Sequence, residues 1–315
     1  MSDPTERGGR SRNLSVIMGE RRQLINVAYR LLGTLADSED MVQETYARWY
    51  ALSQQERDAI DSPGAWMSRV MSRLCLNALS SARARRERFV GEWMPEPLPE
   101  PTEWVSGRSG STAIDPADRV TLDESVSMAY LVVLDSMTPA ERVTFILHDI
   151  FRYPFAEVSE IVGRSAVACR QLASSARRRI RASDALTMTP TGQQARVIKG
   201  VKHACDVGDM GMLVGLLDPE ATMAADGGGL AKTALHPIRG AERIARYALG
   251  VMGEPDDTTV LERTVNGLPG LVLQREGVTV TVAAFQIEGD RITRIWVIRN
   301  PEKLRQWTEN HQDEW

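Results

Sequence analysis

The sequence has few cysteines, few aromatic residues and no long apolar run. Its three cysteines, Cys75, Cys169 and Cys205, lie far apart and never in CxxC spacing, which argues against both a disulfide framework and a zinc site. No apolar run approaches the ~20 residues of a membrane span, and the N-terminal MSDPTERGGRSRN lacks the apolar core of a signal peptide. We therefore expect a protein of the reducing cytoplasm, with no metal, no cofactor and no membrane partner.

Charge is strongly segregated along the chain, although the net charge is only −4. Residues 69–88 contain six arginines and one acid, and residues 163–182 contain six arginines and no acid. Residues 89–126 contain eight acids and two arginines. Because local patches decide what binds where, the mild overall acidity does not exclude a nucleic-acid partner.

At 315 residues the chain can hold two or three domains. Apolar residues at helical spacing predict an all-α first half, whereas β-rich runs separated by NG, EG and GD predict an antiparallel meander near the C-terminus. Helices expected at 191–207, 209–217 and 240–252 make this last part an α+β domain. The predicted divisions are a disordered 1–13, a helical 14–88, a proline- and acid-rich linker 89–118, a second helical part 119–183, and the α+β domain 190–310.

Residues 153–180, YPFAEVSEIVGRSAVACRQLASSARRRI, have the pattern of a helix-turn-helix. A short helix at 154–162 precedes Gly163, which permits a tight turn, and Ser165 is a good N-cap for a second helix at 165–181. The outward face of the second helix mixes side chains suited to phosphates and to base edges; its members are Arg170, Gln171, Ser174, Arg177 and Arg178. The alternative is an ordinary helical hairpin with a solvated basic face.

The first helical part combines an acidic helix with a basic one. Four acids, Asp37, Glu39, Asp40 and Glu44, crowd into ADSEDMVQETYARW (36–49). DNA repels such a helix, so we expect it to face a basic protein partner. The arginines of the basic helix follow Trp66, and a solvated basic face is the alternative reading of that helix.

Between the helical parts, WMPEPLPEP (93–101) alternates proline with acidic and apolar residues. Proline fixes its own backbone angle and keeps the preceding residue out of the helical region, so this stretch is predicted to be extended and stiff. Trp93, Met94 and Leu98 are candidate apolar anchors by which it docks on the C-terminal domain. The alternative is a plain solvated linker.

In this order, AYRLLGTLADSEDMVQETYARW, SPGAWMSRVMSRLCLNAL and the helix-turn-helix resemble regions 2 and 4 of the extracytoplasmic-function (ECF) class of bacterial sigma-70 factors. The resemblance implies a sigma factor that directs core RNA polymerase to promoter DNA. Region 2 would dock on the polymerase and melt the −10 element, and region 4 would read the −35 element as duplex. The implied residues are Asp40, Gln43 and Glu44 for the polymerase; Trp66, Arg69, Arg73, Asn77, Arg83, Arg85 and Arg86 for −10 DNA; and Ser165, Arg170, Gln171, Ser174, Arg177 and Arg178 for −35 DNA.

Three further signatures are similar to those of ECF factors with a fused C-terminal SnoaL-like domain: WMPEPLP at 93–99, DGGGL at 226–230 and NPEKL at 300–304. Leu230 stands where that subgroup usually has lysine. The resemblance implies a SnoaL-like, nuclear-transport-factor-like fold, in which a curved sheet on helices forms a cone-shaped pocket, and a regulatory role in cis. The implied interdomain residues are Trp93, Met94, Leu98, Asp226, Gly227, Gly228, Gly229, Asn300, Pro301, Lys303 and Leu304. A small-molecule ligand in the pocket is a further candidate partner, and the free protein is expected to be monomeric.

Two other functions are compatible with the sequence. One is a helix-turn-helix regulator that acts without polymerase. The other is a SnoaL-type enzyme tethered to DNA-binding helices, with Asp226, His203 and His236 as acid–base groups. Because the spacing of these three residues fits no specific catalytic motif and a fold alone is a weak argument for chemistry, we expect the protein not to be an enzyme.

Overall fold

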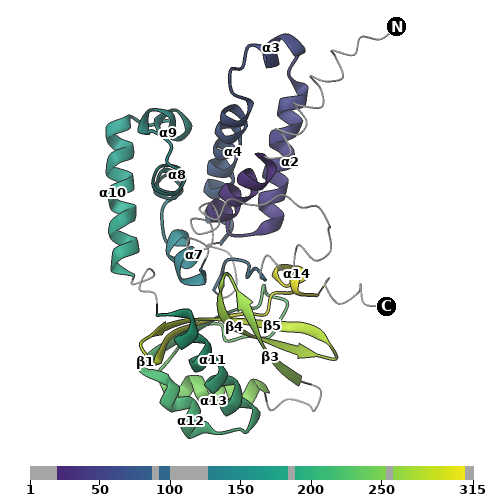
Figure 1. Ribbon diagram of the computed structural model, residues 1–315, viewed down its shortest axis with the longest axis vertical. Coiled ribbons are helices and arrows are strands. Elements are labelled where there is room, and N and C mark those ends of the chain that lie inside the picture. Colours follow the sequence, from purple (N-terminus) through teal and green to yellow (C-terminus); the bar gives the residue numbers. More distant parts are fainter. Residues whose placement is uncertain (1–19, 87–91, 100–126, 184–188, 253–257, 309–315) are drawn as a thin grey trace. The chain divides into compact units, whose positions relative to one another are not determined.

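The structure is a computed structural model that describes residues 20–86, 92–99, 127–183, 189–252 and 258–308 (Figure 1). The chain divides into two compact units, Met1–Arg85 with Leu134–Arg179 and Arg86–Val133 with Ile180–Trp315. The predicted disordered N-terminus and most of the predicted linker lie outside the described residues. Within the described ranges, no helix has both the length and the apolar character needed to cross a membrane.

The first part of the helical unit consists of a helix at residues 20–32, α2 (Leu35–Ala51), α3 (Gln54–Asp58) and α4 (Pro63–Arg86). Ser53 starts α3 with a capping box: its hydroxyl accepts from the Glu56 amide, and the Glu56 carboxylate accepts from the Ser53 amide. The apolar side chains at helical spacing in α4 are buried; they are Met67, Met71, Cys75 and Leu79. The predicted all-α organisation of this part is confirmed.

The second part of the helical unit contains the helix-turn-helix. Its elements are α7 (Met128–Asp135), whose first half belongs to the other unit, α8 (Pro139–Phe145), a π-helical segment (Ile146–Ile150), α9 (Phe155–Val162) and α10 (Ala166–Ala182). Helix α9 ends at Gly163, whose φ of 69° is a conformation that glycine adopts without strain. The Ser165 hydroxyl accepts from the Ala168 amide at 3.2 Å and so caps α10 as expected.

The second unit is an α+β domain built on a six-stranded sheet of order β2-β1-β6-β5-β4-β3. Its elements are α11 (Thr191–Asp206), α12 (Met210–Leu216), β1 (Leu217–Asp226), β2 (Ile238–Arg239), α13 (Ala241–Met252), β3 (Thr258–Val265), β4 (Leu268–Arg275), β5 (Val278–Glu288), β6 (Arg291–Ile298), a 3-10 turn (Pro301–Lys303) and α14 (Arg305–Thr308). Strands β3 to β6 form the predicted antiparallel meander. Asn266 and Gly267, with φ of 51° and 78°, form the tight turn between β3 and β4.

Strand β1 corrects the prediction of a simple meander. It pairs parallel with β6 and antiparallel with β2, so the sheet is mixed. Its sequence, LDPEATMAAD, contains a proline, three acids and three alanines, all of which disfavour strands. Ala221, Met223 and Ala225 nevertheless alternate into the core. Pairing with neighbouring strands, rather than intrinsic preference, makes this segment a strand.

The sheet has two apolar faces with different coverings. Helices α11, α12 and α13 cover the first face (Figure 1), and their core with the sheet includes Ile198, Ile244, Leu271 and Phe285. The second face carries Val272, Val282, Trp296 and Ile298, and its covering residues are Met94, Met128, Leu304 and Trp307. Because side chains alternate along a strand, β4 sends Leu271 to one face and Val272 to the other. The second face is where the predicted interdomain segments lie.

Candidate polymerase, DNA and interdomain sites

The predicted polymerase-binding residues form one exposed face of α2. Asp40, Gln43 and Glu44 are all exposed, and their spacing of three and four residues places them side by side on the helix. The Glu44 carboxylate accepts a hydrogen bond from Arg48 at 2.8 Å, one turn further on. The face therefore carries two exposed carboxylates, of which that of Glu44 is paired with Arg48.

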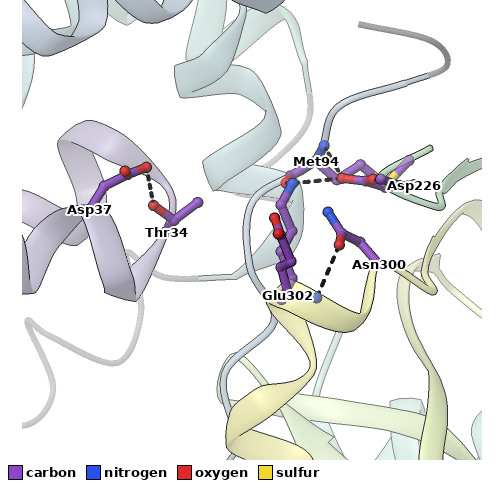
Figure 2. Close-up of polar contacts among 8 residues, drawn as sticks. Thr34, Asp37, Met94, Asp226, Asn300 and Glu302 are labelled. Carbon is purple, nitrogen blue, oxygen red and sulfur yellow. Dashed lines mark hydrogen bonds and ion pairs between the residues drawn. The ribbon is translucent and has the colours of Figure 1, made fainter. Parts of the chain in front are cut away.

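Another acid of the same helix, Asp37, has a structural partner. At the start of α2, the Thr34 hydroxyl donates to the Asp37 carboxylate (Figure 2). The hydroxyls of Ser38 and Thr45 are buried and donate to backbone carbonyls one turn earlier in the chain. These bonds provide partners for the Thr34, Ser38 and Thr45 hydroxyls within the chain. Asp40 lies on the opposite, exposed side of the helix.

The predicted −10 residues Trp66, Arg69, Arg73 and Asn77 follow one another along α4 at spacings of three and four residues, so they share a face. The Trp66 ring packs against Trp49 of α2, with ring centroids 5.3 Å apart. Helix α4 continues through the last three predicted positions, Arg83, Arg85 and Arg86, whose side chains lie outside the described part of the chain.

The first helix of the helix-turn-helix contacts two of these arginines. Arg69 pairs with the Glu160 carboxylate at 3.1 Å, and Arg73 donates to the Glu160 backbone carbonyl at 2.9 Å. Glu160 lies on α9 and has no place in the sequence prediction. In this conformation the α4 arginines are bound to protein at the positions predicted for DNA.

Helix α10 has the two faces that the sequence predicts. Its inner face is buried and comprises Cys169, Ala173, Ala176 and Ile180. Its outer face is exposed and includes Arg170, Gln171, Ser174 and Arg178. The Arg170 guanidinium lies 5.4 Å from the centroid of the Phe155 ring on α9, an arrangement that holds a flexible side chain in place.

Arg177 differs from its neighbour Arg178. It pairs with Asp149 of the π-helical segment at 3.1 Å. Burial raises the pKa of Asp149, and the positive charge of Arg177 acts in the opposite direction. Arg177 therefore has a structural partner, whereas Arg178 is exposed and better placed to contact a phosphate.

Residues 92–99 of the linker lie against the second face of the sheet and are extended, as predicted. Met94 is buried among the apolar side chains of that face. The Leu98 amide donates to the Asn266 side chain at 3.1 Å, and the Asn266 amide donates back to the Leu98 carbonyl at 2.9 Å. The Trp307 indole donates to the Pro97 carbonyl at 2.8 Å. The alternative of a plain solvated linker is therefore wrong for this segment.

A buried ion pair joins the linker to both C-terminal signatures. The Lys303 ammonium donates to Asp226 Oδ2 at 2.6 Å and to the Met94 carbonyl. The Met94 amide donates to the same Asp226 oxygen at 3.0 Å (Figure 2). The Lys303 Nζ also lies 4.3 Å from the centroid of the Trp93 ring. Asp226 is fully buried and Lys303 nearly so, and a buried pair is tolerated when its members are hydrogen-bonded in this way.

The glycine turn and the NPEKL segment pack against each other. The Gly228 amide donates to Asp226 Oδ1 at 2.9 Å, and a Cβ built on Gly228 would lie 2.4 Å from Cγ of Asn300. Asn300 Oδ1 accepts from the Glu302 amide (Figure 2) and starts the 3-10 turn at Pro301. A Cβ on Gly227 would lie 2.3 Å from the Ala231 carbonyl oxygen. The structure thus brings together WMPEPLP, DGGG and NPEKL, which lie far apart in sequence.

Two residues of this site, Asn266 and Trp307, were not predicted from the sequence. Asn266 belongs to an NG pair, which predicts a turn. That pattern does not predict that the side chain and the backbone amide of Asn266 bond to the linker. Trp307 follows the NPEKL signature by three residues, and an isolated tryptophan in a polar C-terminal stretch was the available signal. Both residues contact a segment more than 160 residues away in the sequence, and no local pattern predicts such a contact.

The acid–base residues of the enzyme alternative do not meet. His203 lies exposed on α11, which covers the first face of the sheet, and His236 is exposed between β1 and β2. Asp226 is buried against the linker and Lys303 instead. Asp226 is thus a contact residue between the linker and Lys303.

Comparison with known proteins supports the same division of the chain. The family models Sigma-70 region 2 and Sigma-70, region 4 match residues 16–85 and 127–180. The ECF RNA polymerase sigma factor SigJ of Mycobacterium tuberculosis is 37% identical over 296 residues, which cover 90% of each chain. The probable ECF RNA polymerase sigma factor SigI of the same species is 34% identical over 284 residues, which cover 90% of this chain and 92% of the relative. The crystal structure of SigJ has a TM-score of 0.68 at 32% identity and covers 93% of this chain and 98% of that one.

The chain belongs to the ECF RNA polymerase sigma factor family. The two helical parts are its sigma regions 2 and 4, and the C-terminal α+β domain is a fused SnoaL-like domain like that of SigJ. The predicted family and fold are confirmed.

Proposed function

We propose that the protein directs core RNA polymerase to promoters, and that its SnoaL-like domain regulates this activity in cis. The exposed α2 face of Asp40, Gln43 and Glu44 binds the polymerase, the α4 face binds the melted −10 strand, and α10 reads the −35 duplex. The protein acts in the cytoplasm with its polymerase, and the proposal assigns it no enzymatic activity. Family membership supports the sigma role, and the Asp226–Lys303–Met94 contact is the observation that carries the regulatory role.

While the linker is docked, only short segments connect the sigma regions to the SnoaL-like domain. Only residues 87–91 lie between the end of α4 and the docked segment, and only residues 183–188 lie between the end of α10 and Thr189, which bonds to the sheet. Five or six extended residues span at most roughly 20 Å. While residues 92–99 stay docked, the ends of α4 and α10 can therefore each move only a short distance from the SnoaL-like domain.

Release of the linker removes the first of these limits. The −10 and −35 elements lie about 60 Å apart if some 17 base pairs separate them. An undocked linker of about 30 residues can span roughly 90 Å. Docking thus limits how far regions 2 and 4 separate, and undocking favours the separation that a promoter requires. A ligand in the cone changes this equilibrium only if it binds the two arrangements with different affinity.

Contacts inside the helical unit support a second requirement. Arg69 and Arg73 bind Glu160 in the structure, and the same arginines are assigned to −10 DNA. The α4 face and α9 must separate before that DNA binds. The proposed sequence of events is linker release, separation of α9 from α4, and then promoter engagement.

Run-off transcription with purified core polymerase tests the sigma role. We expect the full-length protein to give promoter-specific transcripts, and the double variant Asp40→Lys/Glu44→Lys to give about one tenth or less, because two favourable charge contacts become repulsive. The control is Glu220→Lys, which reverses one exposed acid on the sheet domain and should match the unmodified protein.

The alternative regulator that acts without polymerase predicts a different outcome. The double variant would then keep its activity, and the protein alone would bind duplex DNA with sequence preference but give no transcript with core polymerase. That pair of results would overturn the sigma role for this chain.

A further inference from the structure

A small apolar cavity lies between the first face of the sheet and its helices. Its volume is about 80 Å³, and α11, α12, α13 and strands β4 to β6 all contribute to its wall. Most lining side chains are aliphatic, and Phe285 lies among them. The cavity belongs to the SnoaL-like domain alone and lies on the opposite face from the docked linker.

One polar atom in this wall has no partner. The Thr281 hydroxyl is buried without a hydrogen bond, and Thr281 itself is only 4% exposed. A buried hydroxyl that lacks a partner is costly. A water molecule would suit the site poorly, because an ordered buried water needs two to four polar partners. The cavity wall offers few: besides Thr281, the side chains with polar atoms are Tyr247 and Cys205.

We propose that this cavity binds a small apolar molecule with a single hydrogen-bonding oxygen, such as a short-chain alcohol or ketone, which bonds to the Thr281 hydroxyl. A dry cavity of 150 Å³ holds benzene, so 80 Å³ accommodates about three or four non-hydrogen atoms. The lining residues include no carboxylate or imidazole, so the site binds its ligand without acid–base chemistry. Tyr247, Ala248 and Val251 are only half-buried and mark the side by which the ligand enters.

Methyl NMR titration of the full-length protein with 1-propanol and 1-chloropropane tests this proposal. The two probes have the same number of non-hydrogen atoms, and only the alcohol both donates and accepts a hydrogen bond. We expect saturable shifts confined to the cavity methyls, for example those of Leu213, Leu271 and Ile295. The Thr281→Val variant keeps the shape but leaves the alcohol hydroxyl buried without a partner, so it should weaken binding of the alcohol about threefold or more and leave binding of the chloride unchanged.

Ala248→Leu supplies the blocking control, because its extra carbons fill the cavity from the half-buried side of α13. We expect this variant to keep the fold and to lose saturable binding of both probes. Non-saturating shifts in the unmodified protein, or shifts unchanged by Ala248→Leu, would overturn the site. Saturable binding of the alcohol that Thr281→Val leaves unchanged would overturn the hydrogen-bonding class of ligand.

A separate observation on α10 identifies a residue for promoter selectivity. Val167 is 61% exposed on α10. Val167, Arg170, Gln171 and Ser174 stand at positions i, i+3, i+4 and i+7, so Val167 extends the predicted base-reading face toward the helix N-terminus. The N-terminal residues of a recognition helix are the ones that reach base edges.

The geometry points to Val167 as the residue that contacts a thymine methyl group in the −35 element. Apolar contact with the C5-methyl is how a side chain without hydrogen-bonding groups distinguishes thymine in the major groove. This inference rests on the proposed function, because it needs α10 to lie in that groove. It adds one apolar contact to a face otherwise made of arginine and polar residues.

Replacing thymine by uracil removes that methyl group and nothing else. The full-length protein would first be used to select its preferred −35 duplex, and each thymine would then be replaced by uracil in turn. We expect one position at which uracil weakens binding about fourfold, the effect of one buried methyl group, and at which Val167→Ala binds both bases equally. Val207→Ala, an exposed valine of the sheet domain, should retain the unmodified response.

The outcomes separate this inference from the sigma role. Selective binding of a −35 duplex with no uracil effect that depends on Val167 would overturn the role of Val167 alone. Failure to select any duplex would overturn the reading of −35 DNA by α10, and the role of Val167 with it.

Discussion

The helical unit and the SnoaL-like domain place their candidate sites in opposite environments. The polymerase and DNA residues of α2, α4 and α10 are mostly exposed and each set lies on one helix. The interdomain site joins residues 94, 226 and 303, and its charged pair is buried. The first kind of site is ready for a partner outside the chain, and the second already has its partner within it.

This difference has an energetic consequence. Exposed ion pairs contribute about 0–1 kcal/mol because water competes for both charges. Loss of one member of a buried pair costs about 3–5 kcal/mol, since the other charge is left without compensation. Exposed sites can thus exchange one partner for another at little cost, whereas breaking the linker contact disturbs a buried and hydrogen-bonded ion pair.

The largest expected effect comes from the buried pair. Lys303→Met leaves Asp226 buried beside the linker without its ammonium partner, and we expect the SnoaL-like domain to lose about 3–5 kcal/mol of unfolding free energy in urea denaturation. The double variant Asp226→Asn/Lys303→Met should recover much of this loss, because it removes both charges.

Lys202→Met is the matched control in the same domain. Its partner Asp206 lies one turn away on α11, and both side chains are substantially exposed. We expect a loss below about 1 kcal/mol. Equal losses from the two lysine variants would show that burial does not distinguish the two pairs.

Two adjacent glycines offer the next comparison. Gly228→Ala places a Cβ against the Asn300 side chain at a φ of +65°, and strain and overlap together should cost about 2–4 kcal/mol. Gly229→Ala has a φ of +73° but open space around the new Cβ, so we expect a cost of about 1 kcal/mol. Thermal unfolding of both variants checks the difference, and similar melting temperatures would argue against close packing of the DGGG turn on Asn300.

The exposed sites of the helical unit could be predicted from the sequence more completely than the buried linker site. The face of Arg170 and Gln171 needed only helical periodicity and a cap, so it was predictable residue by residue. The convergence of three signatures was expected only from the family resemblance, because no local pattern brings residues 94, 226 and 303 together. Asn266 and Trp307 were not predicted, because their contacts with the linker join segments that are distant in the sequence.

Strand β1 was missed for a related reason. Its proline, acids and alanines give no strand signal, and only the pairing of Met223 with Ile295 on β6 and Ile238 on β2 makes it a strand. Glu160 likewise looks like an ordinary surface residue of α9 in the sequence. Its contact with Arg69 depends on how α9 packs within the helical unit.

Stability at high pH depends on one thiol in each unit, that of Cys75, which is buried, and that of Cys205, which is partly buried. Burial raises the pKa of Cys75 on α4 to about 12 and the pKa of Cys205 on α11 to about 11, whereas unfolded cysteine titrates near 8.5. Each thiol therefore contributes stability that is fully present below about pH 8.5 and is lost as pH rises toward its folded pKa. Between pH 9 and 10.5 each thiol should cost about 2 kcal/mol in total.

Urea denaturation from pH 8 to 10.5 measures this loss. Cys75→Ala should lower stability at every pH through lost packing, but its stability should fall less steeply with pH, by about 1.4 kcal/mol per unit. Cys205→Ala should show the same reduction in slope. Slopes unchanged from the unmodified protein would contradict the burial of these thiols.

The smallest expected effect concerns the exposed contact between α4 and α9. Glu160→Gln weakens the ion pair with Arg69 and leaves the backbone contact to Arg73. We expect the free protein to bind a single-stranded −10 oligonucleotide about twofold to fivefold more tightly, as suits an exposed pair worth up to about 1 kcal/mol. Glu157→Gln makes the same change of charge on the same helix and is the control. Equal affinities for the two variants would show that the Glu160 carboxylate does not compete with −10 DNA for Arg69.

Run-off transcription with two glutamine variants tests whether the docked linker regulates the protein. Met94→Gln/Leu98→Gln introduces polar groups at the buried Met94 and at Leu98, whose backbone bonds to Asn266, and Glu92→Gln makes a similar change at an exposed position of the same segment. Faster hydrogen exchange of the Asn266 amide, which bonds to the Leu98 carbonyl, would verify undocking. We expect transcription to change severalfold for the undocked variant and not for Glu92→Gln. Equal transcription from the unmodified protein and both variants, with the linker shown to be undocked, would contradict regulation by the SnoaL-like domain through its linker.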